Sequence, residues 1–394
     1  MEILAHILLA AVALPVTLAC LYLAALTLLS ARLPRPEPRE RTLRFDVLVP
    51  AHDESAVIVR TVQSLLALDW PREHFRVLVV ADNCSDDTAR LAREAGAQVI
   101  ERQDPERRGK GYALEYGIAR SARDGLADAV AVIDADTTVT PNLLSACAAR
   151  IEAGAQAMQA HYGVLNPDES WRTRIVTIAY GAFHAVRSRA RERLGVSCGL
   201  RGNGMCLTHA LLREHPFRIY SMTEDLEYGI VLGLNGIRVR YVDEASADAE
   251  LVGSGSGSRT QRQRWEGGRL NVMRRYTGPL LRAALRRRDP VCLELALDLL
   301  TVPLGYIVLQ IAALFALALI AAIFLPGMLG WAGLALALAG VLALHALRGW
   351  QLCPLGPRAL LDLARVPFFV VWKLVVLLRG RGNRRWIRTD RTPR

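Results

Sequence analysis

Residues 129–136 read AVAVIDAD, five apolar residues that run directly into two aspartates separated by one alanine. An apolar run of this length that ends in polar residues predicts a buried strand entering a loop. Two earlier runs have the same form, FDVLVP at 45–50 before AHDE and VLVV at 77–80 before ADNCSDDT. Further elements are expected between them: helices at 55–67, 85–95 and 109–123, and a short strand at 99–100. This alternation predicts an α/β domain with a mostly parallel sheet.

The rest of the chain is strongly apolar at its ends. The 394 residues are 52% hydrophobic, which excludes a disordered chain, and the long apolar runs exclude a purely soluble protein. Residues 3–31 form one such run, too long for the core of a signal peptide, so a transmembrane helix is predicted there. Two more spans are predicted at about 302–325 and 329–348, with Pro326 and Gly327 forming the turn between them.

The net charge of +11 comes almost entirely from arginine, because lysine occurs only at Lys110 and Lys373. Arginines cluster after the first apolar run and before the second, which predicts an external N-terminus and a cytoplasmic middle region. The last apolar stretch, 358–379, precedes a basic tail, so an interfacial or re-entrant helix is predicted rather than a fourth span. The basic clusters lie beside apolar spans, which favours membrane phospholipid as a partner and argues against nucleic acid.

The predicted organisation therefore has five parts. They are an N-terminal transmembrane helix at 1–32, an α/β domain at 43–268, an amphipathic interfacial segment at 269–300, two transmembrane helices at 301–349, and an interfacial or re-entrant helix with a basic tail at 350–394.

Polar motifs follow the predicted strands, at the edge of a parallel sheet where ligands bind. Asp134 and Asp136 would be costly to bury together without a cation, so a divalent ion with oxygen ligands is predicted, the alternative being a solvated loop. Asp82 is placed to accept hydrogen bonds from a base or ribose, while Ser85 and its acidic neighbours are expected to cap the next helix. Lys110, between two glycines at a helix start, is suited to an anion.

Three later motifs extend this set. Gly202, Asn203, Gly204 and Met205 form a glycine-rich loop that could pack against a ligand. Thr223 is expected to cap a helix whose first turn carries Asp225, a candidate general base, with capping alone as the alternative. Gln261, Arg264 and Trp265 offer an amide, a guanidinium and an indole for a sugar, a phosphate and a stacking face, although a surface helix explains them equally.

Together the strings VPAHDE, ADNCSDDT, GKG, DAD, GNGM, TED and QxxRW, in this order, resemble the membrane-bound family 2 glycosyltransferases. Cellulose, chitin, hyaluronan and bacterial exopolysaccharide synthases belong to that group. The resemblance covers residues from about 45 to 270. It implies a GT-A fold, a nucleotide-sugar donor that is usually UDP-linked, and Mg2+ or Mn2+ as cofactor.

The resemblance also implies roles for individual residues. Asp225 is the implied general base, with Glu224 beside it in the catalytic motif, and Asp134 and Asp136 are the implied metal ligands. The implied donor-binding residues are Pro50, Glu54, Asp82, Lys110, Asp134, Gln261, Arg264 and Trp265. The implied acceptor-binding residues are Gly202, Asn203, Gly204, Met205 and Trp265.

A single base with in-line attack implies inversion, and hence a β-linkage from an α-linked donor. The expected acceptor is a growing polysaccharide, as in exopolysaccharide synthesis, and the alternative left open is a lipid or lipid-linked acceptor that receives a single sugar. Three spans are few for a polymer channel, so polymer export would require a homo-oligomer or an export partner. A scaffold with an inactive domain is disfavoured because Asp136, Asp225 and Arg264 are all present. The resemblance places the protein in a bacterial inner (cytoplasmic) membrane, as a multi-pass protein with a cytoplasmic catalytic domain.

Overall fold

The computed structural model describes residues 2–251 and 257–366, and for residues 257–266 it describes the backbone alone. The chain divides into two compact units. Within the described residues, unit 1 contains 2–31, 167–190 and 300–366, and unit 2 contains 32–166 and 191–299. Each unit is described separately below.

Unit 2 is built on one eight-stranded sheet with the order β3-β2-β1-β4-β7-β6-β8-β5. The strands are β1 Phe45–Ala51, β2 Phe75–Asp82, β3 Gln98–Arg102, β4 Ala129–Val132, β5 Thr137–Val139, β6 Ala157–Val164, β7 Met205–Thr208 and β8 Val239–Ala249. β1 to β4 are mutually parallel, and β7 runs antiparallel to both β4 and β6. The four predicted strands are thus confirmed, and their carboxyl ends share one edge of the sheet.

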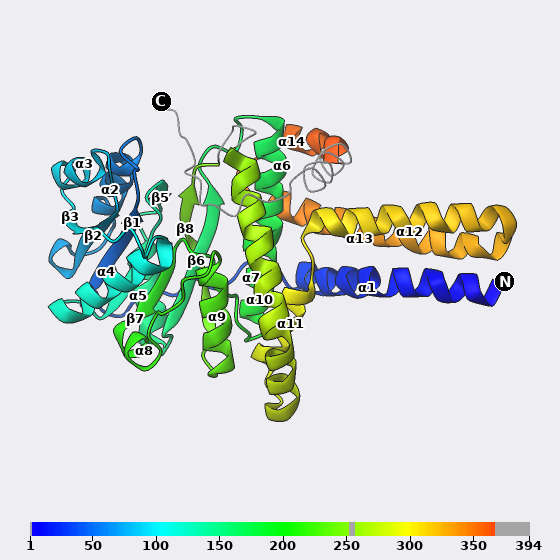
Figure 1. Ribbon diagram of the computed structural model, residues 1–394, viewed down its shortest axis with the longest axis horizontal. Coiled ribbons are helices and arrows are strands. Elements are labelled where there is room, and N and C mark those ends of the chain that lie inside the picture. Colours follow the sequence, from blue (N-terminus) through cyan, green and yellow to red (C-terminus); the bar gives the residue numbers. More distant parts are fainter. Residues whose placement is uncertain (1, 252–256, 367–394) are drawn as a thin grey trace. The chain divides into compact units, whose positions relative to one another are not determined.

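Helices cover both faces of this sheet because successive strand residues point to opposite sides (Figure 1). Val47 and Val49 of β1 pack in one apolar cluster with α2, α3 and α5, while Leu48 packs in another with α4, α8 and α9. These helices are α2 Ile58–Leu66, α3 Thr88–Glu94, α4 Lys110–Asp124, α5 Leu143–Glu152, α8 His209–Glu214 and α9 Glu224–Leu234. The predicted helices at 55–67, 85–95 and 109–123 correspond to α2, α3 and α4.

Unit 2 continues into two helices, α10 Gly257–Arg287 and α11 Pro290–Leu300. Their apolar residues form a cluster with α9, in which Val272, Leu280 and Leu295 are buried against Ile230. Leu285 remains 82% exposed. Part of the apolar face of the segment 269–300 is therefore used for packing within the unit, and its proposed contact with a membrane surface stays a prediction.

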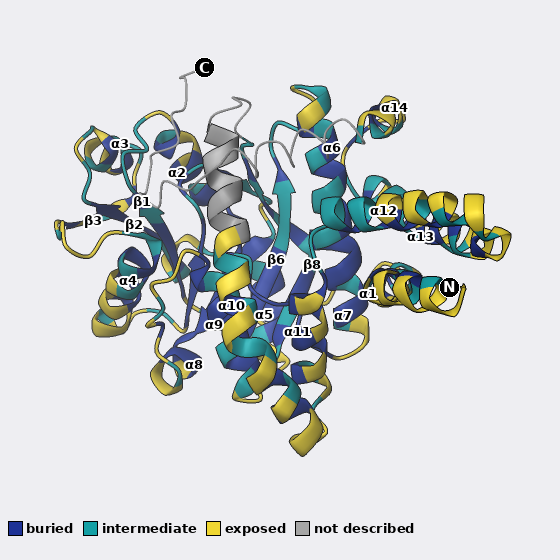
Figure 2. Ribbon diagram, turned by 45° about the vertical axis from the view of Figure 1, so that its right-hand side comes forward, coloured by how far each residue is buried: buried dark blue, intermediate teal, exposed yellow. Residues whose placement is uncertain are grey.

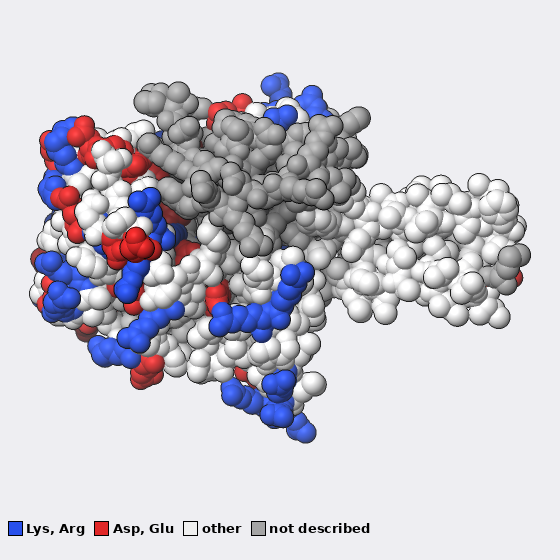
Figure 3. All heavy atoms as spheres, viewed as in Figure 1, with Lys and Arg blue, Asp and Glu red and all other residues white. Residues whose placement is uncertain are grey.

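Unit 1 contains three long apolar helices, α1 Glu2–Leu28, α12 Leu304–Phe324 and α13 Leu329–Gln351. Each is long and apolar enough to cross a membrane. They pack side by side around a shared apolar cluster, while their outer faces are exposed (Figure 2). Charged residues are nearly absent from their surface (Figure 3). The three predicted spans therefore correspond to real helices, and the turn predicted at Pro326 and Gly327 is the short 3-10 helix Pro326–Met328.

The rest of unit 1 consists of shorter elements. Residues 167–190 include α6 Trp171–Tyr180 and a π-helical segment, Gly181–Val186, that leads into α7 Arg187–Arg193. Of the last predicted helix, 358–379, only the start is described, as α14 Arg358–Asp362 and the turn Leu363–Arg365. Residues 367–394 lie outside the described part of the chain, so that prediction and the basic tail stay untested.

Candidate active site

The two aspartates of the DAD motif lie in the turn between β4 and β5. Asn203, whose side chain is fully buried, forms hydrogen bonds to this turn. The Asn203 Oδ1 accepts a hydrogen bond from the backbone N–H of Asp134 at 3.1 Å, and its Nδ2 donates to Thr137 Oγ1 at 3.0 Å. One amide side chain therefore ties the start of the turn to its end and fixes how the aspartates are presented.

Lys110 begins α4 and reaches across to this turn. Its Nζ forms an ion pair with the Asp134 carboxylate and donates a hydrogen bond to the carbonyl oxygen of Gly202 at 2.7 Å. Burial raises the pKa of Asp134, the Lys110 charge opposes that rise, and Asp136 adds to it. The only lysine of the α/β domain is therefore the counter-charge of the predicted metal-binding aspartate.

Asp225 lies in the first turn of α9 and close to Gly202. Gly202 has a left-handed backbone with φ +77°, and a Cβ there would lie 3.0 Å from Asp225 Oδ2 and 3.3 Å from Lys110 Nζ. Burial raises the pKa of Asp225, while Lys110 lowers it. The pKa of the adjacent Glu224 is raised to about 7 by burial and then by the charge of Asp225. A buried carboxylate with a raised pKa is a stronger general base, as proton abstraction requires.

The predicted capping roles of Thr223 and Ser85 are wrong. Thr223 occupies the N-cap position of α9, but its side chain makes no capping hydrogen bond, and its buried Oγ1 has no partner among the side chains and backbone that the structure describes. At α3 the N-cap is Asp87, and the hydroxyl and N–H of Ser85 both donate to Asp53 instead. In both cases an interaction with another segment of the chain takes the place of the capping hydrogen bond.

Asp82 ends β2 and is buried, with 5% of its surface exposed. Its Oδ1 accepts from Arg102 Nη1 at 2.6 Å and from Asn83 Nδ2 at 3.1 Å. Arg102, at the end of the neighbouring strand β3, also lies over the ring of Tyr112 at 5.8 Å. No local pattern predicts this buried ion pair, because the partners are 20 residues apart and meet only through the pairing of β2 with β3. Contact of Asp82 with a nucleotide base stays a prediction.

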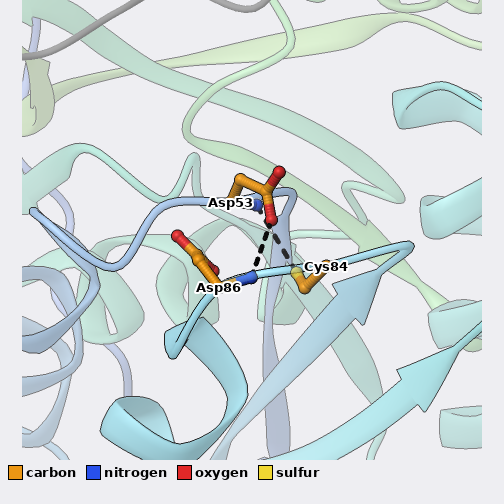
Figure 4. A group of neighbouring side chains, drawn as sticks. All are labelled: Asp53, Cys84 and Asp86. Atoms are coloured by element: carbon orange, nitrogen blue, oxygen red, sulfur yellow. Dashed lines mark hydrogen bonds between the residues drawn. The ribbon is translucent and has the colours of Figure 1, made fainter.

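A second acidic group joins the loops after β1 and β2, and it was not anticipated. Asp53, Cys84 and Asp86 each place a ligand atom within 4.8 Å of the others (Figure 4). The Asp53 carboxylate already accepts hydrogen bonds from the backbone: the N–H groups of Ser85 and Asp86 donate to its Oδ1 at 2.6 and 3.2 Å. Burial raises the pKa of Cys84 to about 11, so its thiol stays protonated at neutral pH. The group acts as a structural link between two loops of the site.

The remaining predicted residues divide by position. Pro50 lies in β1 opposite Val80, and the backbone N–H of Glu54 donates to Thr88 Oγ1 at 2.7 Å. The backbone N–H of Gly204 donates to Val132 at 2.9 Å, and Met205 is buried at the start of β7. Met205 and Asn203 thus support the site from within the core, and their contact with an acceptor stays a prediction. Residues 261, 264 and 265 fall on α10, and their side chains lie outside the described part of the structure.

Comparison with known proteins gives consistent matches. The family model described as "Glycosyltransferase like family 2" matches residues 43–268. "Probable glycosyltransferase YdaM" of Bacillus subtilis is 23% identical over 62% of this chain and 59% of its own length. "Beta-monoglucosyldiacylglycerol synthase" of Synechocystis is 29% identical over 56% of this chain and 47% of its own length. The chain thus spans about half the length of the curated relatives it matches.

A solved structure resembles much of this chain in fold. It is "Mannosyltransferase PcManGT from Pyrobaculum calidifontis in complex with GDP-Man and Mn2+", which covers 87% of this chain and 99% of its own. The sequence identity is 18% and the TM-score is 0.52. This likeness concerns the fold alone, and it confirms the predicted GT-A fold.

Proposed function

The chain belongs to the glycosyltransferase-like family 2, and from this membership we propose that it transfers a hexose from a nucleotide diphosphate sugar to an acceptor at a membrane. The observation that carries the proposal is the convergence of three motifs on one short loop. Lys110 contacts Asp134 and Gly202, and Gly202 in turn lies against Asp225. The predicted donor-side and acceptor-side motifs, far apart in sequence, thereby share one site.

The donor set fits a hard divalent cation. Asp134 and Asp136 supply carboxylate oxygens, and the Asp134 side chain, 29% exposed, forms an ion pair with Lys110. These two aspartates would hold Mg2+ or Mn2+, which supplies positive charge for the diphosphate of the donor. The structural relative bound to GDP-Man and Mn2+ supports this assignment by analogy of fold. UDP is proposed as the nucleotide from the family resemblance.

The protein's own groups account for the proton and the leaving group. Asp225 accepts the proton of the acceptor hydroxyl as its oxygen forms a bond to the anomeric carbon. The bond from that carbon to the diphosphate breaks, and its electron pair leaves with the diphosphate. Glu224 is the neighbour of Asp225 in the chain, and the charge of Asp225 adds to the rise in the pKa of Glu224 that burial causes. Attack opposite the leaving group inverts the anomeric centre, so an α-linked donor gives a β-linked product.

Of the two acceptors that the sequence leaves open, unit 1 favours a lipid that receives a single sugar. Its three long helices fill their shared interior with apolar side chains, among them Val16, Leu23, Ile311 and Leu314. A polysaccharide needs a path lined with polar groups, and these packed residues supply none. The name of the Synechocystis relative, a diacylglycerol glycoside synthase, agrees with a lipid acceptor. Extension of a polysaccharide remains the second candidate.

The location of the reaction follows from charge. Arginine clusters flank the apolar helices, which supports a multi-pass protein of the bacterial cytoplasmic membrane with unit 2 on the cytoplasmic side. Nucleotide sugars are charged and are supplied in the cytoplasm, which agrees with that orientation.

The test uses the purified full-length protein in detergent, a panel of nucleotide sugars, and Mg2+ or Mn2+ with and without a chelator. Nucleotide release and product size are measured in the presence of membrane lipid. One discrete glycolipid is the expected product, whereas a ladder of long products would support the polysaccharide. Asp225→Asn should abolish transfer and leave nucleotide binding intact. Transfer that survives Asp225→Asn would refute its role as the base.

A further inference from the structure

Helices α9 and α10 lie side by side and run in the same direction (Figures 1 and 2). Their contacts follow one another in order along both helices. Thr223 lies against Gly268, Glu227 Oε1 accepts from Tyr276 Oη at 2.7 Å, and Arg287 donates to the carbonyl oxygen of Leu234 at 2.8 Å. The start of α9, which carries Asp225, is therefore registered against a fixed point of α10.

Gly268 of α10 lies in close contact with Thr223, the residue that precedes α9. A Cβ built on it would lie 2.6 Å from Thr223 Cγ2 and 3.0 Å from Thr223 Oγ1, so a side chain does not fit without movement. Its neighbour Gly267 would meet nothing within 4 Å. Of the two adjacent glycines of α10, only Gly268 therefore lies against Thr223, two residues before Asp225.

Thr223 gives up a usual interaction to make this contact. A threonine at an N-cap normally accepts a hydrogen bond from the helix it begins, yet the hydroxyl of Thr223 is buried here with no partner within the described residues. Leaving a buried hydroxyl unpaired is unfavourable. Packing against Gly268 thus takes precedence over capping at the position two residues before the general base.

We propose that Gly268 is a positioning residue, whose missing side chain sets the distance between Asp225 and the residues 261–265 at the start of α10. This inference rests on the proposed glycosyl transfer. With a rise of about 1.5 Å per residue, position 265 lies roughly 4.5 Å and position 261 roughly 10 Å before Gly268 along the α10 axis. Because the helices run in parallel, these positions extend past the start of α9, on the side where Asp225 begins the helix. The contact at Gly268 brings the two catalytic motifs into register.

The experiment compares Gly268→Ala with Gly267→Ala in the full-length protein. Both changes favour the helix intrinsically, but only Gly268→Ala pushes against Thr223. The expected result for Gly268→Ala is a loss of roughly 10-fold or more in kcat, with little change in KM for the nucleotide sugar, because displacement by a fraction of an ångström impairs the reacting geometry. Gly267→Ala should keep the kcat of the parent protein.

Two further measurements separate positioning from loss of structure. Adding Thr223→Ser to Gly268→Ala removes the methyl group that the new Cβ meets, so kcat should recover while Thr223→Ser alone does not raise it. Thr223→Val keeps the packing and removes only the hydroxyl, so it should retain kcat, whereas Thr223→Ala should lower it. These single changes at Thr223 test the contact even if Gly268→Ala does not fold.

Several results would overturn the proposal. They are equal kcat for the two glycine variants, a loss that Thr223→Ser does not relieve, or the same loss in Thr223→Val as in Thr223→Ala. A parent protein that releases nucleotide from no sugar donor would instead refute the proposed function, and this inference with it. An active parent with indistinguishable variants would refute the positioning role alone.

Discussion

Replacing Gly202 by alanine tests whether Lys110, Asp134 and Asp225 form one site. The added Cβ would lie 3.0 Å from Asp225 Oδ2 and 3.3 Å from Lys110 Nζ, which is closer than unstrained contacts allow. Both side chains must then move by a few tenths of an ångström. Since a misplacement of about 1 Å can reduce a rate about 100-fold, a loss of roughly 10-fold in kcat is expected.

The backbone contributes a separate effect that must be subtracted. Gly202 has φ +77°, and an alanine in this left-handed region costs about 1–2 kcal/mol in the free energy of unfolding. Gly236 has φ +78° and would place its Cβ with nothing within 4 Å, so Gly236→Ala carries the same backbone cost without the contact. The two variants should therefore lose similar stability, and only Gly202→Ala should lose activity beyond that.

The assay is the rate of nucleotide release at saturating donor, measured beside a thermal unfolding curve of each purified variant. Equal specific activity in Gly202→Ala and Gly236→Ala would refute the reasoning, because it would mean that the positions of Lys110 and Asp225 do not limit the reaction.

Two other predictions concern stability. The pKa of Glu224 is raised from 4.5 to about 7, so between these pH values the folded protein retains a proton that the unfolded chain releases. The free energy of unfolding should therefore fall as the pH rises from about 4.5 to about 7. In melting curves recorded over this pH range, Glu224→Gln should show a smaller fall than the parent protein. Arg191 is fully buried and pairs with Glu294 and Asp298 at 2.5 Å each, so Arg191→Met should cost about 3–5 kcal/mol in the free energy of unfolding by removing the cation that pairs with two buried carboxylates. The exposed Arg193 of the same helix is the control, and an equal loss in Arg193→Met would contradict the assignment.

The elements of the fold could be predicted where the signal is local. The runs that became β1, β2 and β4 are apolar and bounded by polar residues, and the helices between them show their periodicity directly. The three long helices of unit 1 were predictable for the same reason, since length and composition suffice to identify a helix that is long and apolar enough to cross a membrane. The motifs then fell at one sheet edge because parallel strands end together.

Interactions between segments far apart in sequence could not be predicted. The pairing of Arg102 with Asp82 and that of Asn203 with the turn at Asp134 could not be predicted, because no sequence pattern near either residue identifies its partner. The glycines around Asn203 predicted a loop packed against a ligand, but no local pattern shows that the Asn203 side chain enters the core; its contact with an acceptor, implied by the family resemblance, stays a prediction. The capping prediction for Thr223 failed for a related reason: the competing contact comes from α10, which no pattern near Thr223 reveals.

The charge balance of the site shows why its parts depend on one another. Burial raises the pKa of Asp134, Glu224 and Asp225, and Lys110 opposes the rise at all three. One ammonium group thus offsets part of the cost of three buried carboxylates, which is a large demand in a medium less polar than water. Any group that adds positive charge beside Asp134 therefore stabilises the site. A divalent cation does so, and it leaves Lys110 able to interact with the negative diphosphate. Lys110, the domain's only lysine, is the counter-charge of Asp134, and its contact with the donor diphosphate stays a proposal.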